Sequence, residues 1–123
     1  MKYLCLVYIH EKKLDAVPES QSPPSIDEHL DYDKALKRSG HFIASEALEP
    51  GEAAKVVRVR NGQLSTTDGP FAETREQLGG FYLIDARDLS DAIQVAAKIP
   101  SARTGSIEVR PITELTRDHE EER

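Results

Sequence analysis

Cysteine, methionine and tryptophan are nearly absent from this 123-residue chain, which has one Cys, one Met and no Trp. The single cysteine, Cys5, cannot form a disulfide within the chain, so stability must come from a packed core. A chain of this length buries roughly two thirds of its unfolded surface, which is enough for such a core. Because Cys5 lies in an apolar run, we predict a small core residue rather than a nucleophile.

Long apolar segments and an excess of basic residues are also missing. No segment approaches the roughly 20 apolar residues of a membrane span, and the N-terminus has no basic region followed by a signal-type apolar stretch. The 16 Lys and Arg are outnumbered by 22 Asp and Glu, which gives a formal net charge of −6. Nucleic acid and anionic membranes, which require concentrated basic surfaces, are therefore disfavoured as partners, and we expect a cytoplasmic protein.

Spacings typical of cofactor sites are absent as well. The four histidines, His10, His29, His41 and His119, form no compact metal-ligand spacing. No glycine-rich loop follows a strand and opens a helix in the pattern that binds nucleotides. The sequence therefore predicts neither a metal nor a nucleotide cofactor.

The residues that are present fit one compact soluble domain, with 38% hydrophobic and 31% charged content. We expect residues 1–115 to form this domain and the charged residues 116–123 to form a disordered tail. Prolines at positions 18, 23 and 24 predict a loop over residues 11–24.

Short-range patterns predict the secondary structure. Residues 3–9 are a continuous apolar run, too short for a typical helix and rich in strand-favouring residues, so we predict a strand covered on both faces. Ser25 and Glu28 have the spacing of a capping box that begins a helix, and Gly40 closes that helix. Further strands are predicted at residues 41–48, 54–60, 63–67, 81–86 and 106–110, with a tight hairpin turn at Asn61-Gly62.

A second helix is predicted to begin after Asp88 and to end at Pro100. Both helices carry apolar residues at helical spacing, which predicts one core-facing stripe on each. In the first helix the stripe consists of Ile26, Leu30 and Leu36 with Tyr32 and Ala35 beside them, and in the second it consists of Leu89, Ala92, Ile93, Ala96 and Ala97.

The order strand, helix, strand, hairpin, strand, helix, strand contains two split strand-helix-strand units. The economical topology is an α+β, ferredoxin-like sheet with an added β-hairpin and with both helices on one face. A monomer would leave the other sheet face wet, although the first strand is apolar on both faces. We therefore expect a second copy of the chain to cover that face in a homodimer.

The loop after the hairpin concentrates turn chemistry and carboxylates. Asp68-Gly69-Pro70 is a strong turn signal, since Asp bonds its own following backbone, Gly tolerates positive φ and Pro fixes φ. Two interpretations remain open. The loop is either a rigid connection between strands or a preset support that holds Asp68 and Glu73 at a cleft.

Two adjoining motifs, DGPFAET at residues 68–74 and EQLGGFY at residues 76–82, resemble the signature of the DGPF group within the YCII-related family. The resemblance extends through the opening Lys2-Tyr3 and through SEAL at 45–48, IPSA at 99–102 and GSIEVRP at 105–111. It implies small bacterial proteins with a ferredoxin-like domain that forms a dimeric α+β barrel.

The resemblance also implies a candidate pair for acid-base chemistry. Family members carry a His in the first helix and an Asp elsewhere, and His29 occupies the corresponding helical position. Asp68 is the favoured carboxylate, with Glu46 as a competitor. A His titrates near neutral pH, and a carboxylate fixes its tautomer. The alternative is a helix-surface or partly buried His29 bonded to a neighbour such as Asp33.

Across the expected barrel, aromatic and polar side chains would line a cleft for a small organic molecule. The candidates beside His29 and Asp68 are Tyr8, Tyr32, Phe71 and Glu73, and simple core packing is the favoured alternative for Phe71. The favoured function is a module that binds a small molecule or a protein, and the resemblance suggests an accessory to an extracytoplasmic-function sigma factor. The alternative is a cofactor-independent isomerase or lyase that uses His29 and Asp68.

Overall fold

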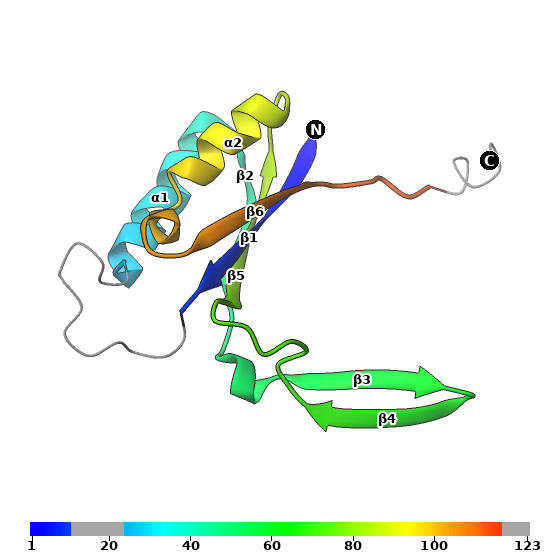
Figure 1. The fold of residues 1–123 in the computed structure, drawn as a ribbon. Coiled ribbons are helices and arrows are strands. Elements are labelled where there is room, and N and C mark those ends of the chain that lie inside the picture. Colours follow the sequence, from blue (N-terminus) through cyan, green and yellow to red (C-terminus); the bar gives the residue numbers. More distant parts are fainter. Residues whose placement is uncertain (11–23, 117–123) are drawn as a thin grey trace.

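The computed structural model describes residues 1–10 and 24–116, so most of the predicted proline-rich loop and of the predicted tail lies outside the described residues. Figure 1 shows the arrangement of the elements. In chain order they are β1 (Lys2–Ile9), α1 (Ile26–Ser39), β2 (Phe42–Ala47), η2 (Gly51–Ala53), β3 (Lys55–Arg60), β4 (Gln63–Asp68), β5 (Gln77–Asp85), α2 (Leu89–Ala97), η3 (Pro100–Arg103) and β6 (Ser106–Pro111).

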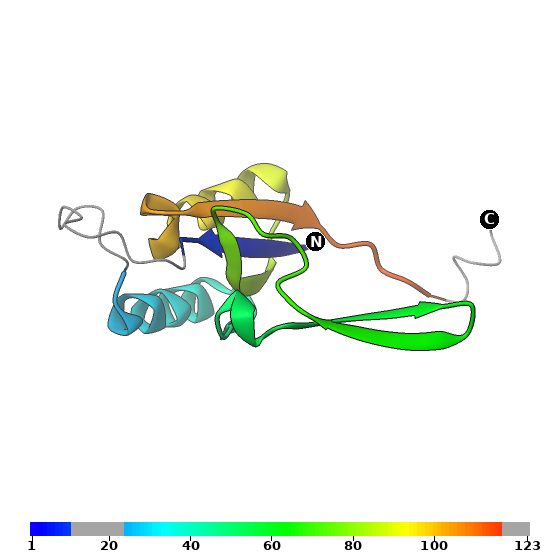
Figure 2. The ribbon, with the colours of Figure 1, turned by 60° about the horizontal axis from the view of Figure 1, so that its bottom comes forward.

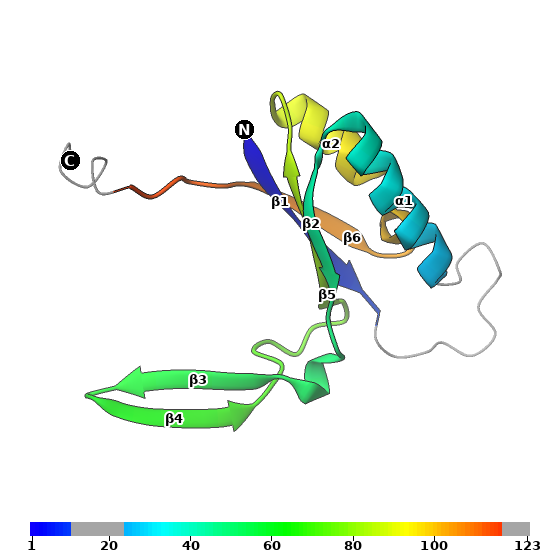
Figure 3. The same ribbon diagram turned by 180° about the vertical axis from the view of Figure 1, so that it is seen from behind.

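The central sheet has four strands in the order β2-β5-β1-β6, and each neighbouring pair is antiparallel. Both α-helices lie on the same side of this sheet (Figures 1 and 3). The α+β class is therefore as predicted, and the strand order is compatible with a ferredoxin-like fold.

The core lies between the sheet and the helices. Alternate residues of β1, Tyr3, Cys5 and Val7, are buried on the helix side. Burial raises the pKa of the Cys5 thiol to about 11, so the sulfur stays protonated and serves as a packed core atom, as predicted. The other buried hydrophobic residues are Leu36, Tyr82, Ile84, Ala86, Ala92, Val95, Ala96 and Ile99.

Helix α1 begins and ends as predicted, but a different face is turned inward. The Ser25 hydroxyl accepts from the Glu28 N–H at 3.2 Å, and Gly40 ends the helix at φ 82°. The prediction that Ile26 and Leu30 face the core is wrong, because both are exposed. The inward positions, three and four residues apart, belong to His29, Tyr32, Asp33 and Leu36.

Helix α2 shows an error of the same kind. The Asp88 carboxylate accepts from the Asp91 N–H at 2.9 Å and caps the helix as predicted. Ala92 and Ala96 are buried together with Val95, whereas Leu89, Ile93 and Ala97, which were predicted to face the sheet, are exposed. The helix ends at Ala97, and Pro100 instead begins η3.

The other face of the sheet carries no helix and is apolar at its centre. On β1, the residues that alternate with the buried ones are Leu4, Leu6 and Tyr8, and all three are only half-buried. Leu4 pairs across the ladder with Leu83, and Leu6 pairs with Phe81. Within the described residues, β1 is therefore covered on one face and not on both. We call this surface the helix-free face.

Strands β3 and β4 form a separate two-stranded sheet, paired from Lys55↔Asp68 to Arg60↔Gln63. Asn61 and Gly62 at its tip have φ of 53° and 74°, which confirms the predicted hairpin, since two positive φ values mark the favoured turn. The hairpin projects from the sheet on the side away from the helices, the same side on which residues 112–116 leave β6 (Figures 1 and 2).

Candidate functional site

A polar cluster lies beneath α1, where its inward face meets the sheet. His29 is placed there by the helical spacing, and its two ring nitrogens contact two hydroxyl groups. Nδ1 lies 3.0 Å from the Tyr82 hydroxyl of β5, and Nε2 lies 3.2 Å from the Ser101 hydroxyl of η3. Tyr82 and Ser101 are both buried. Three elements that are distant in the sequence therefore meet at one imidazole.

The electrostatics of the cluster favour a neutral imidazole. Burial lowers the pKa of His29 below its ordinary value, and Asp33 and Glu28 oppose this effect. A neutral ring donates from one nitrogen and accepts at the other, which two hydroxyl partners can match. Burial and the nearby Asp33 carboxylate raise the pKa of Tyr82, so this phenol is a hydrogen-bond donor at neutral pH.

Asp33 adds a carboxylate to the same cluster, one helical turn from His29. Its Oδ2 accepts a hydrogen bond from the Ser45 hydroxyl of β2 at 2.9 Å. Its Oδ1 is buried and has no hydrogen-bond partner among the described residues. The neighbour that the sequence offered as the alternative for His29 thus acts on it through charge, while the hydrogen bonds of His29 go to Tyr82 and Ser101.

We predict that His29 contributes acid sensitivity to the fold. Because its pKa is lowered in the folded chain, the unfolded chain binds the proton first. The stabilisation is complete above the unfolded pKa of about 6.5 and is lost as the pH falls below it. Urea unfolding at pH 7 and pH 5 should show a smaller loss of stability in His29→Gln than in the natural protein.

The control for that experiment is His10→Gln, which removes an imidazole outside the cluster. An equal loss of stability between pH 7 and pH 5 in His29→Gln and in the natural protein would contradict the assignment of a neutral, half-buried imidazole.

The structure does not bring His29 and Asp68 together within the chain. Asp68 ends β4, is largely exposed and forms an ion pair with Lys55 at the base of the hairpin. Helix α1 lies on the opposite side of the central sheet (Figures 1 and 3). Glu46, the competing carboxylate, is exposed on β2. A His29-Asp68 pair remains a prediction that needs a second chain to supply one of the two residues.

Tyr32 and Phe71 have opposite surroundings. The Tyr32 hydroxyl donates to the Val95 carbonyl at 2.6 Å, its ring packs edge-on at 6.2 Å from the ring of Tyr82, and burial raises its pKa to about 12. The Tyr32 side chain thus links α1 to α2. Phe71 is 80% exposed, so the favoured alternative of core packing is wrong, and the Arg58 guanidinium lies 5.7 Å from its ring centre.

A groove of about 780 Å³ lies between the end of β1, the beginning of β6 and the segment that precedes β5. This volume is within the range of small-molecule sites. One predicted ligand-binding residue, Tyr8, lines it; Glu73 is exposed next to the lining segment but is not part of it. The lining residues are Tyr8, His10, Thr74, Arg75, Glu76, Ser106, Ile107 and Glu108.

The carboxylates of this groove are already engaged. Glu76 accepts from the Ser106 hydroxyl at 2.7 Å and lies 3.4 Å from the His10 imidazole. Glu108 accepts from the Tyr8 hydroxyl at 3.3 Å and is paired with Arg110, whose hydrogen bond lowers the pKa of that carboxyl. Both acids therefore hold the walls of the groove in place.

Arg75 is the charged group of the groove that is not engaged. Its guanidinium makes no hydrogen bond or ion pair with any described residue. The segment that carries it is fixed by Gln77, whose side-chain amide donates to the carbonyls of Ala72 at 3.0 Å and Thr74 at 2.9 Å. Residues 72–77 are thus held in place by hydrogen bonds within the segment. In the groove that they border, the Arg75 guanidinium is the cation available to a ligand, and it lies with Tyr8 and Ile107 in the lining.

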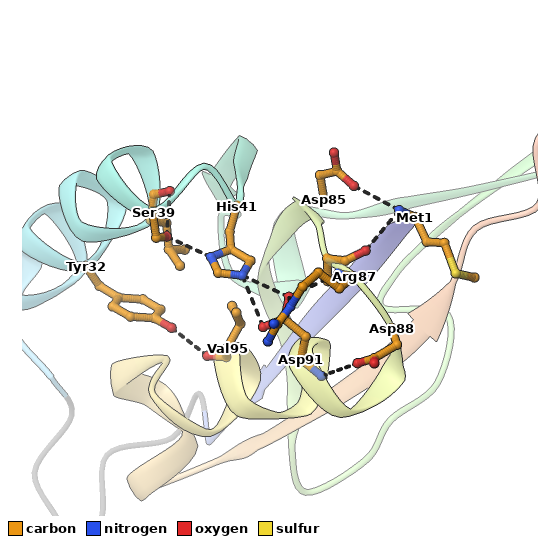
Figure 4. A network of polar contacts seen from close by, with 11 residues as sticks. Met1, Tyr32, Ser39, His41, Asp85, Arg87, Asp88, Asp91 and Val95 are labelled. Atoms are coloured by element: carbon orange, nitrogen blue, oxygen red, sulfur yellow. Dashed lines mark hydrogen bonds and ion pairs between the residues drawn. The ribbon is translucent and has the colours of Figure 1, made fainter.

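A contact between His41 and Asp91 fastens α2 to the residue that precedes β2 (Figure 4). Asp91 Oδ2 lies 3.1 Å from His41 Nε2 and accepts from the Arg87 N–H at 3.0 Å. The pKa of Asp91 is lowered by the bond from Arg87 first and by His41 second. His41 Nδ1 lies 2.7 Å from the Ser39 hydroxyl, which donates to the Leu36 carbonyl at the end of α1. The arrangement joins three elements and has a structural role.

Sequence reasoning missed Tyr82 and Ser101 as partners of His29. Both occur in segments that carry the family resemblance, Tyr82 in EQLGGFY and Ser101 in IPSA. Neither Tyr nor Ser indicates a site by its residue type alone. The available signal was the alternation in β5, where Tyr82 and Ile84 share the helix-facing side. No short-range pattern links Ser101, 72 positions away, to His29.

In the described part of the chain, no group of three or more His, Cys, Asp or Glu residues is placed to hold a metal ion. No helix there is long and apolar enough to cross a bilayer.

Comparison with known proteins identifies the family. The profile of the YCII-related domain matches residues 1–116. An uncharacterized protein from Rhizobium meliloti (strain 1021) is 35% identical over 114 residues, which cover 91% of this chain and 92% of that protein. Because this match spans nearly the whole sequence, the chain belongs to the YCII-related family.

Proposed function

We propose that this protein is a homodimeric domain that binds a small organic carboxylate in the groove beside Tyr8. The observation that carries the proposal is the available guanidinium of Arg75 in a groove of about 780 Å³. An arginine fork matches a carboxylate in two parallel hydrogen bonds. The ring of Tyr8 and the side chain of Ile107 supply apolar contact for the rest of such a molecule.

The homodimer is proposed from the helix-free face. The cross-strand pairs Leu4↔Leu83 and Leu6↔Phe81 place four large apolar side chains at the centre of the sheet face that no described helix covers. Packing two such faces around a two-fold axis removes them from water and produces the dimeric α+β barrel that the family resemblance implies. The groove opens beside this face, since Tyr8 and Glu108 both belong to it.

The test is a screen of small carboxylic acids by ligand-observed NMR, followed by titration of each hit. Arg75→Gln should weaken binding by at least about tenfold, because a charge-assisted bond is lost. Arg38→Gln, which removes an exposed guanidinium from α1, is the matched control and should bind normally. Equal affinity in Arg75→Gln and in the natural protein would refute the groove as the carboxylate site.

A second candidate function is acid-base catalysis at His29, favoured by its contacts with two hydroxyl groups. A neutral imidazole between Tyr82 and Ser101 can pass a proton from one side to the other. His29 lines neither the groove of Tyr8 nor the smaller groove between α2 and β6. We therefore rank this function below binding. If a substrate is found, unchanged turnover in His29→Gln would refute catalysis at His29.

Association with a sigma factor remains a prediction of the resemblance, which a pull-down at micromolar concentration can test.

A further inference from the structure

The β3–β4 hairpin, residues 55–68, is an extended element that projects from the body of the molecule, and we call it the arm (Figures 1 and 3). Val57, Val59 and Leu64 of the arm are 60%, 59% and 69% exposed. Val59 and Leu64 are direct cross-strand partners, and Val57 is on the same side of the same strand. The arm therefore presents a stripe of three apolar side chains to its surroundings.

Among the described residues, few contacts hold the arm in place. The hydrogen bonds of its side chains run within the hairpin, and the bond from the Gly69 N–H to the Ala54 carbonyl at 2.8 Å extends the same ladder. The Arg58 guanidinium, 5.7 Å from the ring centre of Phe71, reaches beyond the hairpin. An isolated two-stranded hairpin is only marginally stable in water. A long arm with exposed valines and a leucine is thus expected to have a packing partner.

The charge of the arm differs from that of the rest of the chain. Lys55, Arg58 and Arg60 are opposed only by Asp68, so the arm has a formal charge of +2. The other described residues, 1–10, 24–54 and 69–116, contain 9 Lys and Arg and 14 Asp and Glu, which gives a formal charge of −5. The arm is therefore a basic, partly apolar element attached to an acidic body, and charge complementarity favours contact between an arm and the body of another copy.

We propose that, in the homodimer, the arm of each protomer packs against the body of its partner. This inference rests on the proposed homodimer and adds a second area of contact to it. The arm and the helix-free face lie on the same side of the molecule (Figures 1 and 2). A copy seated on that face is therefore the occupant within reach of the arm. Two-fold symmetry makes the exchange reciprocal, so both arms are covered at once.

Hydrogen exchange of the arm amides tests the proposal directly. In the dimer the amides of β3 and β4 should exchange at least about tenfold more slowly than in a monomeric variant, because a covered hairpin opens less often. Leu6→Glu provides the monomer by placing a carboxylate at the centre of the helix-free face, next to Phe81 and Glu108 in the ladder. Equal exchange rates of the arm in dimer and monomer would overturn the proposal.

Carboxylates placed on the stripe supply a second measurement that does not depend on the folding of Leu6→Glu. Val57→Glu with Leu64→Glu should raise the dimer dissociation constant by at least about tenfold in sedimentation experiments, because both positions lie on the apolar face of the arm. The matched control is Leu89→Glu with Ile93→Glu, which adds the same charge at exposed apolar positions on the helices' side and should dimerise normally.

The outcomes separate the two proposals. If Leu6→Glu dissociates the dimer while the arm variant does not, the homodimer stands and the arm contact is wrong. If the natural protein is a monomer at millimolar concentration, the homodimer fails and the arm contact fails with it.

Discussion

Gly105→Ala is expected to destabilise the protein by about 3 kcal/mol or more, since overpacking against backbone cannot be relieved by a side-chain rotation. A Cβ on Gly105 would lie 2.1 Å from the Tyr8 carbonyl oxygen and 3.3 Å from the Ser101 carbonyl oxygen. Tyr8 lines the groove and Ser101 contacts His29, so this one position sets the spacing beside both candidate sites. Urea unfolding, followed by circular dichroism, measures the change.

The control for Gly105→Ala is Gly40→Ala at the end of α1. Gly40 has φ of 82°, but nothing lies within 4 Å of the Cβ that alanine would add. The left-handed backbone conformation alone should cost about 1–2 kcal/mol. A smaller loss for Gly105→Ala than for Gly40→Ala would contradict the close approach of Gly105 to β1.

Ile84→Ala is expected to cost about 3–4 kcal/mol of unfolding free energy, because it removes three carbon atoms from a site that is fully buried. Ile84 has no exposed surface and lies in β5, between β2 and β1, beneath the helices. The surrounding strands are fixed by hydrogen bonds on both sides, so the cavity can close only partly. Thermal and urea unfolding of the variant provide the measurement.

The same substitution at Ile93 is the matched control. Ile93 lies on α2 and is 52% exposed, so Ile93→Ala should cost less than about 1 kcal/mol. The comparison also tests two orientations of α2. In the structure Ile93 is exposed, whereas the sequence pattern predicted that it packs on the sheet. Equal losses at positions 84 and 93 would support the predicted stripe and contradict the observed orientation of α2.

Most element boundaries were predictable because they depend on chemistry within a few residues. Ser25 and Asp88 cap their helices through bonds to a backbone N–H three positions ahead. Gly40 and Asn61-Gly62 adopt the positive φ angles for which their residue types are suited. The order of these elements was then enough to predict the α+β class.

The inward face of α1 was not predictable from hydrophobicity. The pattern favoured Ile26 and Leu30, yet the inward positions belong to His29 and Asp33, whose polar groups find partners on distant strands and in η3. A buried polar residue is stable only where such partners exist, and the sequence does not say where they lie. The distant hydrogen-bond partners of His29 and Asp33 therefore explain both the orientation of α1 and the presence of the polar cluster beneath it.

Part of the groove was predictable and part was not. Tyr8 was expected at a cleft and lines one, and the turn chemistry at Asp68-Gly69-Pro70 gave a loop adjacent to it. Turn rules fix the local shape of a loop but not its direction. The groove is lined by Arg75 and Glu76, while Phe71 of the same loop is exposed beside the hairpin.

The buried thiol of Cys5 in β1 can report how often the native protein opens. Cys5 has no exposed surface, is the only sulfhydryl in the chain and has a pKa of about 11, so a thiol reagent can modify it only after the central sheet opens. The rate of its labelling therefore counts openings of the native protein without any added probe. A cysteine introduced at the surface would react far sooner, so the two positions can be told apart by reaction time alone.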